Sequence, residues 1–404
     1  MRRKSENSTQ CSFFPPSSDV STASKIVARN LKGKKKKFFA AQEPQSAVKA
    51  AIVAKYFLPW AHISRQRTGR VLYLDLYAGP GIYDDGSPST PLLVLQQIID
   101  HPELHDKVVT FFGDKDQRTI SKLDVNIKGL PGISNLKFPP VVKAGEVTGK
   151  LAEQLAALRL VPTLMFLDPC GYKGISADII RAVLQNPGSE CVLFFNYNRI
   201  NPAIRNPDVR HHVDAIFGTE RVDKLFAALP ALDNAGTERM VMEALRESMR
   251  EIGAGYVQAF RFRKGPRITH HLVFIGTHPL GHKIMKDVMS KHSNHSSQGV
   301  ASFEFVQAKD TASISMFNEE PHPIDDLKVD LLKTFAGKSV TVKCIFEQHN
   351  LGTPYVLKNY KDAVRELMRD GKIPVGTRTE EHKPPLKYPY NVMPDDVLIR
   401  FPSI

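Results

Sequence analysis

The sequence predicts an α/β protein in which helices cover both faces of a parallel β-sheet, followed by a smaller helical domain with a β-wing. Three observations predict this fold class. Short apolar segments alternate with helical segments between residues 70 and 195. Two further apolar segments lie close together between residues 256 and 276, and after residue 322 three short helical segments precede a β-like end.

The N-terminal segment carries most of the positive charge of the chain. The 404 residues have a formal net charge of +13, and residues 1–40 contribute ten Lys and Arg but only two Asp and Glu. Ser, Lys and Pro predominate up to residue 44 without an apolar period, so we expect residues 1–44 to form a disordered basic tail. A lysine run attracts any polyanion, and the overall charge therefore does not by itself identify a nucleic-acid-binding protein.

The composition disfavours membrane and secreted proteins. No apolar run approaches the ~20 residues that cross a bilayer, and the N-terminus lacks the apolar segment of a secretory signal. The four cysteines lie far apart, which argues against a disulfide framework or a zinc site. The histidine pairs at 211–212 and 270–271 lack a zinc-binding spacing, and we expect them on loop or strand surfaces. We therefore expect a cytoplasmic protein with no metal site.

The first domain, residues 45–322, begins with a lead-in helix. Val48, Ile52, Tyr56 and Ile63 share one helical face, which Pro59 interrupts. Alternating strands and helices then follow in short succession. The predicted strands span residues 70–76, 108–113, 141–142, 163–167 and 191–195, and the predicted helices span residues 92–99, 119–127, 149–159 and 177–184.

A helical insertion (residues 198–252) and two strands (256–262 and 271–276) complete this domain. The two strands are joined by a short loop and should pair antiparallel at one edge of the sheet. Five parallel strands closed by such a hairpin outline the Rossmann-like fold of S-adenosylmethionine-dependent methyltransferases. Ligands of such sheets bind at the carboxyl ends of the strands.

The second domain, residues 323–404, is predicted as a small winged helix-turn-helix. Helical segments at 324–335, 344–349 and 354–371 precede a polar stretch and the apolar end VLIRF. Lys358, Lys361, Arg365 and Arg369 recur at spacings of three or four, with Lys372 continuing the row, and we expect them to face phosphates. The alternative is a solvated amphipathic helix with ordinary surface charges.

The first strand and its turn suggest a cofactor site. Asp75 ends an apolar strand, and Gly79 and Gly81 follow in a turn where glycine lets the backbone approach a ligand. We expect this turn at the surface, so that a side chain at Gly81 would meet the ligand. The alternative is an ordinary strand-to-helix turn.

Two acids after the next strands extend the expected cofactor site. Asp114 closes the second strand, where Rossmann-like folds place a carboxylate on ribose hydroxyls. Asp116 competes for this role, and both acids could simply cap the next helix. Glu146 follows the third strand, where it would contact the adenine amine.

The fourth strand ends in FLDPCGYKG, which partly matches the Asp/Asn-Pro-Pro-Tyr motif of amino-methyltransferases. Asp168 and Pro169 fit the motif and would orient the methyl acceptor, while Cys170 and Gly171 stand in place of Pro and the aromatic residue, with Tyr172 one place later. A structural turn is the alternative for this segment. Asn196 and Arg199, after the fifth strand, are expected at the mouth of the acceptor pocket, where they would contact nucleic acid.

The order and spacing of these motifs resemble the bacterial three-Cys-motif partner protein family. The matching features are Trp60, YLDLYAGPG, Tyr83 with GSP, FFGDKD, FLDPCG, FFNYNR, HHLVFIGTHPLGHKIMKDVM and the terminal winged helix, over residues 46–372. The resemblance implies an S-adenosylmethionine-binding Rossmann-like domain and a protein partner that carries a three-cysteine motif.

Two functions follow as hypotheses. The first is an S-adenosylmethionine-dependent methyltransferase that acts on DNA or RNA, alone or with the partner. The second is a non-catalytic nucleic-acid-binding partner that keeps the methyltransferase fold while another protein performs the chemistry.

Overall fold

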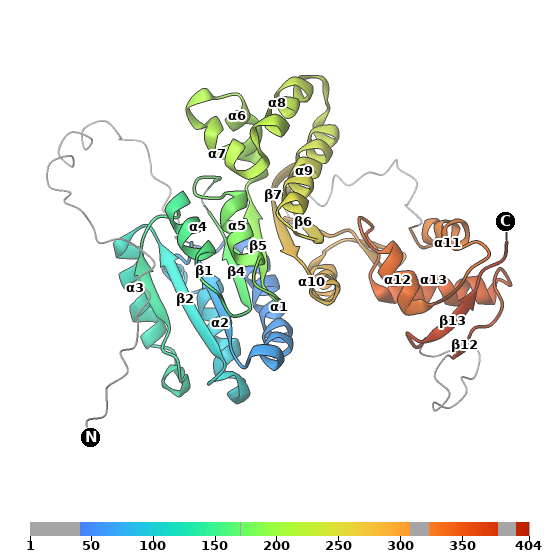
Figure 1. Ribbon diagram of the computed structural model, residues 1–404, viewed down its shortest axis with the longest axis horizontal. Coiled ribbons are helices and arrows are strands. Elements are labelled where there is room, and N and C mark those ends of the chain that lie inside the picture. The colour runs from blue at the N-terminus through green and yellow to red at the C-terminus, as the bar shows by residue number, and fades with distance from the viewer. Residues whose placement is uncertain (1–40, 170, 308–322, 379–392, 404) are drawn as a thin grey trace.

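The computed structural model describes residues 41–169, 171–307, 323–378 and 393–403 (Figure 1). The expected basic tail up to residue 40, Cys170 and most of the expected wing loop lie outside the described residues. None of the described helices is long and apolar enough to cross a membrane.

The first domain is built on one mixed sheet in the strand order β10-β6-β7-β5-β4-β1-β2-β3. The first five strands are parallel, and β7 pairs antiparallel with both β5 and β6. This topology is the methyltransferase fold predicted from the sequence. The strands are β1 (Val71–Asp75), β2 (Val108–Asp114), β3 (Val141–Ala144), β4 (Thr163–Leu167), β5 (Glu190–Phe195), β6 (Tyr256–Lys264), β7 (Arg267–Gly276) and β10 (Glu304–Val306).

The β6–β7 hairpin does not form the outer edge of the sheet, which differs from the prediction. Strand β10 pairs parallel with β6 and covers it. Arg261 and Arg263 of β6 each lie 3.5 Å from the Glu304 carboxylate of β10. Such a short strand cannot be recognised from the sequence, because three residues are too few for a periodic pattern.

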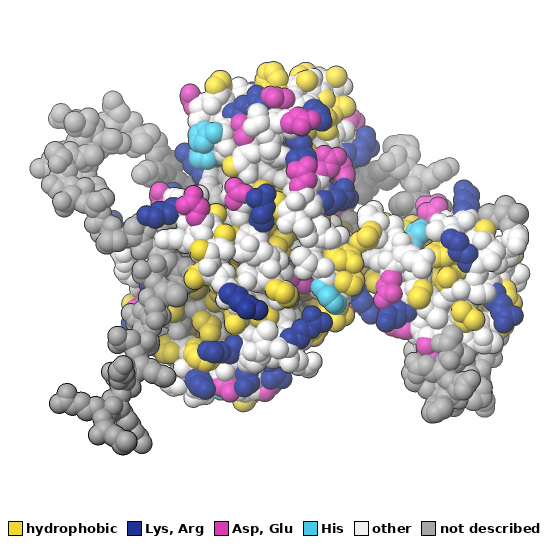
Figure 2. All heavy atoms as spheres, in the orientation of Figure 1, with side chains coloured by type: hydrophobic (Ala, Val, Ile, Leu, Met, Phe, Trp, Pro, Cys, Tyr) yellow, Lys and Arg dark blue, Asp and Glu magenta, His cyan; other side chains and the backbone are white. Residues whose placement is uncertain are grey.

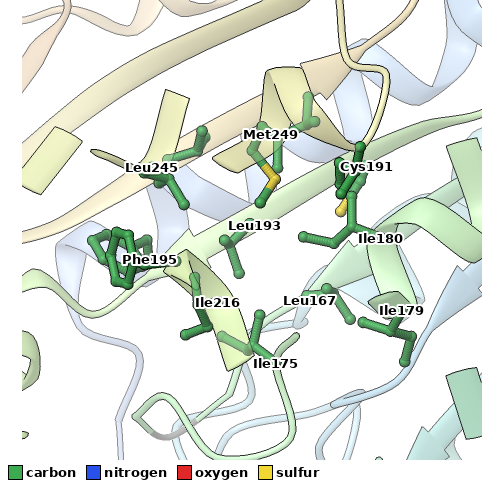
Figure 3. Close-up of a cluster of buried hydrophobic side chains, with 14 of the residues drawn as sticks. Leu167, Ile175, Ile179, Ile180, Cys191, Leu193, Phe195, Ile216, Leu245 and Met249 are labelled. Carbon is green, nitrogen blue, oxygen red and sulfur yellow. The ribbon is translucent and has the colours of Figure 1, made fainter. Parts of the chain in front are cut away.

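Helices cover the two faces of the sheet, and each face has its own apolar core. Figure 3 shows the face on which Leu167, Cys191 and Leu193 of the strands meet side chains from several helices, Ile180 and Met249 among them. The helices on this face are α4 (Gly149–Ala156), α5 (Ala177–Leu184), α6 (Tyr197–Ile204), α7 (Pro207–Phe217), α8 (Thr219–Ala228) and α9 (Asn234–Glu251); the other face carries α1 (Pro44–Thr68), α2 (Thr90–Ile99), α3 (Gln117–Lys128) and α10 (Pro279–His292).

Helix α1 continues through Pro59, so the interruption expected there is wrong. A proline inside a helix removes one backbone hydrogen bond and costs about 3 kcal/mol. Phe57 and Trp60 on either side of it are buried against the sheet, with ring centroids 6.2 Å apart. Burial of two large aromatic side chains offsets this cost, which local propensity alone does not reveal.

The second domain has the winged helix-turn-helix fold predicted for it. Its three-stranded sheet has the order β11-β13-β12, and Leu327, Phe346, Tyr360 and Ile399 belong to a separate apolar core. Its elements are α11 (Pro323–Thr334), β11 (Ser339–Thr341), α12 (Val342–His349), α13 (Leu357–Arg369), β12 (Thr377–Arg378) and β13 (Val397–Arg400).

A small hairpin, β8 (Ser296–Ser297) and β9 (Val300–Ala301), packs on this second domain. Val300 belongs to the winged-helix core, and the Asn359 side chain donates a hydrogen bond of 3.1 Å to the Gly299 carbonyl. The hairpin therefore contacts the winged helix, although it precedes residue 323.

Buried Lys286 of α10 joins the two domains. Its Nζ donates a 2.6 Å hydrogen bond to the carbonyl of Asn350, the residue that ends α12. A cation at the carboxyl end of a helix is favourable. Burial nevertheless lowers the pKa of Lys286 to about 7.

Helices α1 and α10 meet at the base of β5. The Tyr56 hydroxyl donates a hydrogen bond to the buried Glu190 carboxyl, whose pKa burial raises to about 8. Gly281 of α10 lies directly over this pair, and a Cβ there would overlap the Glu190 carboxylate and lie 3.0 Å from the Tyr56 hydroxyl. Glycine at this position lets α10 approach the sheet.

Replacing Gly281 with Ala should lower the free energy of unfolding by about 1–3 kcal/mol, because neither buried partner can move away cheaply. The control is Gly149→Ala at the start of α4, where a Cβ has no atom within 4 Å. We expect this control to change stability by less than about 0.5 kcal/mol. Urea unfolding of both variants checks the prediction, and equal stabilities would contradict the close packing of α10.

Candidate cofactor and acceptor site

Two acidic side chains lie at the point where the strand order reverses, between β1 and β4. Asp75 ends β1 and pairs in register with Phe166, two residues before Asp168. Open α/β sheets bind ligands at the carboxyl ends of the strands at such a switch point. The structure therefore brings the first expected cofactor residue and the expected catalytic acid to one place.

Asp75 is almost completely buried, with 1% of its surface exposed. One carboxyl oxygen accepts a 3.0 Å hydrogen bond from the Tyr77 amide, and the other is buried with no hydrogen-bond partner among the described residues. Burial is the main cause that raises the pKa of this carboxyl well above its usual range. The nearby Tyr73 hydroxyl is also buried and finds no partner in the described part of the chain, and burial followed by the Asp75 and Asp168 charges raises its pKa.

The glycine turn after β1 is joined to Asp114 at the end of β2. The Gly79 amide donates to one Asp114 carboxylate oxygen at 3.2 Å, and the Asp116 amide donates to the other at 3.0 Å. Asp116 itself caps α3 by accepting from the Arg118 amide at 2.9 Å. Each Asp114 oxygen keeps acceptor capacity for a further donor such as a ribose hydroxyl.

Gly81 is buried, so the expectation that this part of the turn is at the surface is wrong. Its φ is 85°, and a Cβ would lie 2.8 Å from Leu123 Cδ1 and 3.5 Å from Leu92 Cγ. A side chain at Gly81 would therefore disturb the packing of α2 and α3. The sequence could not separate this structural need from direct contact with a ligand.

Glu146 is exposed two residues beyond the end of β3. The preceding Gly145 amide donates a 2.9 Å hydrogen bond to the Asp114 carbonyl. The residue thus lies at the same carboxyl edge of the sheet as Asp75 and Asp114.

Asp168 forms an ion pair with Lys49 of α1. Lys49 is buried, and its Nζ also lies 4.5 Å from the centre of the Phe194 ring on β5. The Asp168 side chain keeps 25% of its surface exposed, and Pro169 beside it is buried. Lys49 is not among the residues predicted from the sequence. Its signal is a lysine on the same helical face as the apolar residues Ile52 and Val53, which follow it by three and four positions.

His270 and His271 of β7 are not surface residues, which corrects the expectation for this pair. The His270 ring stacks on Phe194 with centroids 4.5 Å apart, and burial followed by the Lys49 charge lowers its pKa to about 4. His271 is buried on the opposite face, where its Nε2 lies 2.8 Å from Glu238 Oε1. Because β7 lies between β5 and β6, His271 is buried, while His270 near the start of the strand is half-buried. Within the described ranges, no group of three or more His, Cys, Asp or Glu side chains could hold a metal ion.

A cavity of about 580 Å³ adjoins this cluster. It brings together three of the predicted residues, Tyr172, Asn196 and Arg199, with residues of the β6–β7 hairpin that were not singled out in the sequence. The lining consists of Tyr172, Asn196, Asn198, Arg199, Pro202, Ala203, Asn206, Val209, Lys264, Arg267, Thr269 and His270.

The basic row on α13 is partly neutralised within its own domain. Lys361 Nζ lies 2.5 Å from Asp395, and Arg365 lies 2.5 Å from Asp362. Lys358, Arg369 and Lys372 are exposed. On the face shown in Figure 2, basic and acidic side chains are mixed over both domains.

One family model matches most of the second domain together with the residues just before it. Residues 297–379 match the family model of the GMT-like winged helix-turn-helix domain. No curated protein shows a significant match to the chain.

Similar solved structures have low identity. A Legionella pneumophila protein of the DUF519 family is 14% identical, covers 60% of this chain and 92% of its own, and has a TM-score of 0.36. A Methanococcus maripaludis protein described as an S-adenosylmethionine-dependent methyltransferase is 12% identical over 57% of this chain and 90% of its own, with a TM-score of 0.28. The DszA carbon methyltransferase is 14% identical over 59% of this chain and 56% of its own, with a TM-score of 0.34. The fold assignment therefore rests on the sheet topology described above.

The Lys49–Asp168 pair should show strong coupling in a double-mutant cycle. Lys49→Met and Asp168→Asn should each lower the free energy of unfolding by about 2 kcal/mol, because each leaves a largely buried charge without its partner. The double variant removes both charges, so its free energy of unfolding should fall by less than the sum of the two single losses.

The control cycle uses the exposed pair of Arg181 and Asp178 on α5, whose side chains are 55% and 68% exposed. Its coupling should stay below about 1 kcal/mol. Chemical unfolding measures both cycles, and similar couplings would show that the Lys49–Asp168 contact is an ordinary surface pair.

Proposed function

We propose that this protein is an S-adenosylmethionine-dependent methyltransferase that acts on nucleic acid. The observation that carries the proposal is the buried Asp75 carboxyl group, one oxygen of which has no hydrogen-bond partner among the described residues, next to Asp168 at the switch point of a methyltransferase fold. A buried carboxylate of this kind favours a ligand that brings a positive charge or a hydrogen-bond donor.

The residues at the edge of β1–β3 fit S-adenosylmethionine, which carries both an ammonium and a sulfonium charge. Asp75 and the amides of the turn containing Gly79 and Gly81 would hold its charged part, Asp114 would accept from the ribose hydroxyls, and Glu146 would accept from the adenine amine. The cofactor supplies the methyl group that an acceptor nucleophile takes up by in-line displacement. The chain's own contribution is alignment of the acceptor and exclusion of water.

Asp168 would accept a hydrogen bond from the amine of the acceptor, and Pro169 and Tyr172 would shape the pocket around it. The ion pair with Lys49 would hold this carboxyl group in place beside the pocket. His270 stays neutral near pH 7 because of its lowered pKa, so it adds no positive charge beside Lys49.

A nucleic-acid substrate is supported by the winged helix and by the cations near the cavity. Lys358, Lys361, Arg365 and Arg369 would contact phosphates from α13, and Asn196 and Arg199 would contact the strand at the cavity. The resemblance to the three-Cys-motif partner family further suggests a protein partner with a three-cysteine motif.

One observation favours the second candidate, a non-catalytic nucleic-acid-binding partner. One oxygen of the Asp168 carboxylate already binds Lys49, which would compete with an acceptor amine for that oxygen. In this function the protein would keep the cofactor fold and supply binding, while its partner performs the chemistry.

Methyl transfer from isotope-labelled S-adenosylmethionine to mixed DNA and RNA separates the two functions, with the partner protein present and absent. Asp168→Asn should lower turnover by ~100-fold or more, while calorimetry shows S-adenosylmethionine affinity within about threefold of the unmutated protein. Asp178→Asn, an exposed acid on α5, is the control and should retain full turnover. Full turnover in Asp168→Asn would leave this segment with a structural role only.

The exposed cations of α13 in the winged helix provide a second test, of nucleic-acid binding. Lys358→Gln with Arg369→Gln should reduce the slope of log affinity against log salt for duplex binding by about 1.8, or 0.9 for each lost phosphate contact. The matched control is Lys128→Gln with Arg181→Gln, which removes two exposed cations from α3 and α5. Identical slopes in the two double variants would show that α13 does not bind phosphate.

A further inference from the structure

The cavity lies where the β6–β7 hairpin projects beyond its neighbour. Strand β5 ends at Phe195, which pairs with His271, so residues 267–270 of β7 extend past the carboxyl end of β5. Helices α6 and α7 form the opposite wall. The space between these elements therefore opens at the same edge of the sheet as Asp75 and Asp168.

The cavity is connected to the Asp168 cluster through one wall. His270 lines it and stacks on Phe194, and Lys49, the partner of Asp168, lies over the same Phe194 ring. Tyr172, four residues after Asp168 in sequence, also lines the cavity. A molecule inside it would therefore be close to the proposed acceptor site.

The charge of the lining is entirely positive. Arg199, Lys264 and Arg267 are exposed there, and no Asp or Glu occurs among the described residues that line the cavity. The Arg267 guanidinium donates a 3.1 Å hydrogen bond to the Asn198 side chain, which directs it toward α6. The first turn of α6 starts at this wall, and the positive end of its helix dipole also favours an anion.

Three asparagine side chains and the rings of Tyr172 and His270 also line the cavity. Asparagine offers both a donor and an acceptor and suits the edge of a nucleobase. Tyr172 and His270 provide the flat surfaces on which unpaired bases stack. The volume of about 580 Å³ is that of a small-molecule pocket, and a duplex about 20 Å wide is far too large for it.

We propose that this cavity binds a single unpaired nucleotide of the nucleic-acid strand, with its phosphate held by Arg199, Lys264 and Arg267. This inference rests on the proposed function, in which it defines the form of the substrate. It assigns the β6–β7 hairpin tip to substrate binding and places the base between the hairpin and Asp168. The winged helix would hold flanking nucleic acid while the cavity receives one nucleotide.

The test uses the full chain with Lys34, Lys35, Lys36 and Lys37 changed to Gln, so that the lysine run does not mask the effect. Fluorescence anisotropy measures binding of a labelled 20-nucleotide single strand, its blunt duplex and free AMP as competitor over a range of salt. Lys264→Gln with Arg267→Gln should weaken single-strand binding ~10-fold or more and lower its salt slope by about 1.4, or 0.7 per contact. The control is again Lys128→Gln with Arg181→Gln, which should bind as tightly as the parent.

Each possible result of this experiment either supports or overturns the proposed nucleotide site. The expected result is a loss confined to the single strand, with duplex binding and S-adenosylmethionine affinity unchanged. Equal single-strand binding by the cavity variant and the control variant would overturn the proposal. The proposal would also be overturned if the cavity variant lost as much affinity for the duplex as for the single strand. Competition by AMP as strong, per mole, as that of the unlabelled strand would also overturn it, because the cavity would then serve a free nucleotide. If single-strand binding is lost as expected but no methyl transfer is detected, the proposed methyltransferase function is rejected and the proposed nucleotide-binding cavity is retained.

Discussion

Burial of charge at the carboxyl ends of β1 and β4 is the constraint on which the rest of the first domain depends. Asp75 and Asp168 lie side by side at the switch point, and a buried carboxylate without compensation costs several kcal/mol. Lys49 supplies the compensation for Asp168, and it reaches that position only when α1 packs along the face of β1, β4 and β5. The charged pair therefore fixes the place of the lead-in helix.

The position of α1 then determines that of α10 and, through it, the second domain. Tyr56 of α1 binds Glu190 at the base of β5, and Gly281 lets α10 close over this pair. Lys286 on the same helix binds the end of α12 in the winged helix. The Tyr56–Glu190 contact buries two ionisable side chains, so removal of the Tyr56 hydroxyl would leave the Glu190 carboxyl without this hydrogen bond. A chain of single polar contacts thus links the candidate site to the winged helix.

The sequence predicted the parts of the structure that depend on local pattern. The five parallel strands, the β6–β7 pair, the glycine turn and the winged helix follow from apolar periods and from residues such as Gly79 and Asp114 that stand at strand ends. The parts it missed depend on contacts between distant segments. Pro59 is tolerated because of packing against the sheet, β10 is ordered by pairing with β6, and Gly81 is required by Leu123 of α3.

The same distinction applies to the candidate site. Asp75, Asp114 and Asp168 could be chosen because each ends a strand, and the structure places Asp75 and Asp168 at one switch point with Asp114 at the same edge. Lys49 and His270 could not be assigned, since their roles come from α1 and β7 packing on Phe194. Of the cavity lining, only Tyr172, Asn196 and Arg199 could be predicted from the sequence, because the other wall lies on a hairpin about 70 residues further along the chain.

The cavity lies beside the charged pair. A fully enclosed Asp168 would need more partners than Lys49 alone, so the pair is tolerated because the carboxylate keeps part of its surface open. Because β7 extends past the end of β5, the hairpin tip and α6 form a cavity at the same edge of the sheet, with His270 and Tyr172 in its wall. In the proposed function, an acceptor bound in this cavity would approach Asp168 past these two side chains.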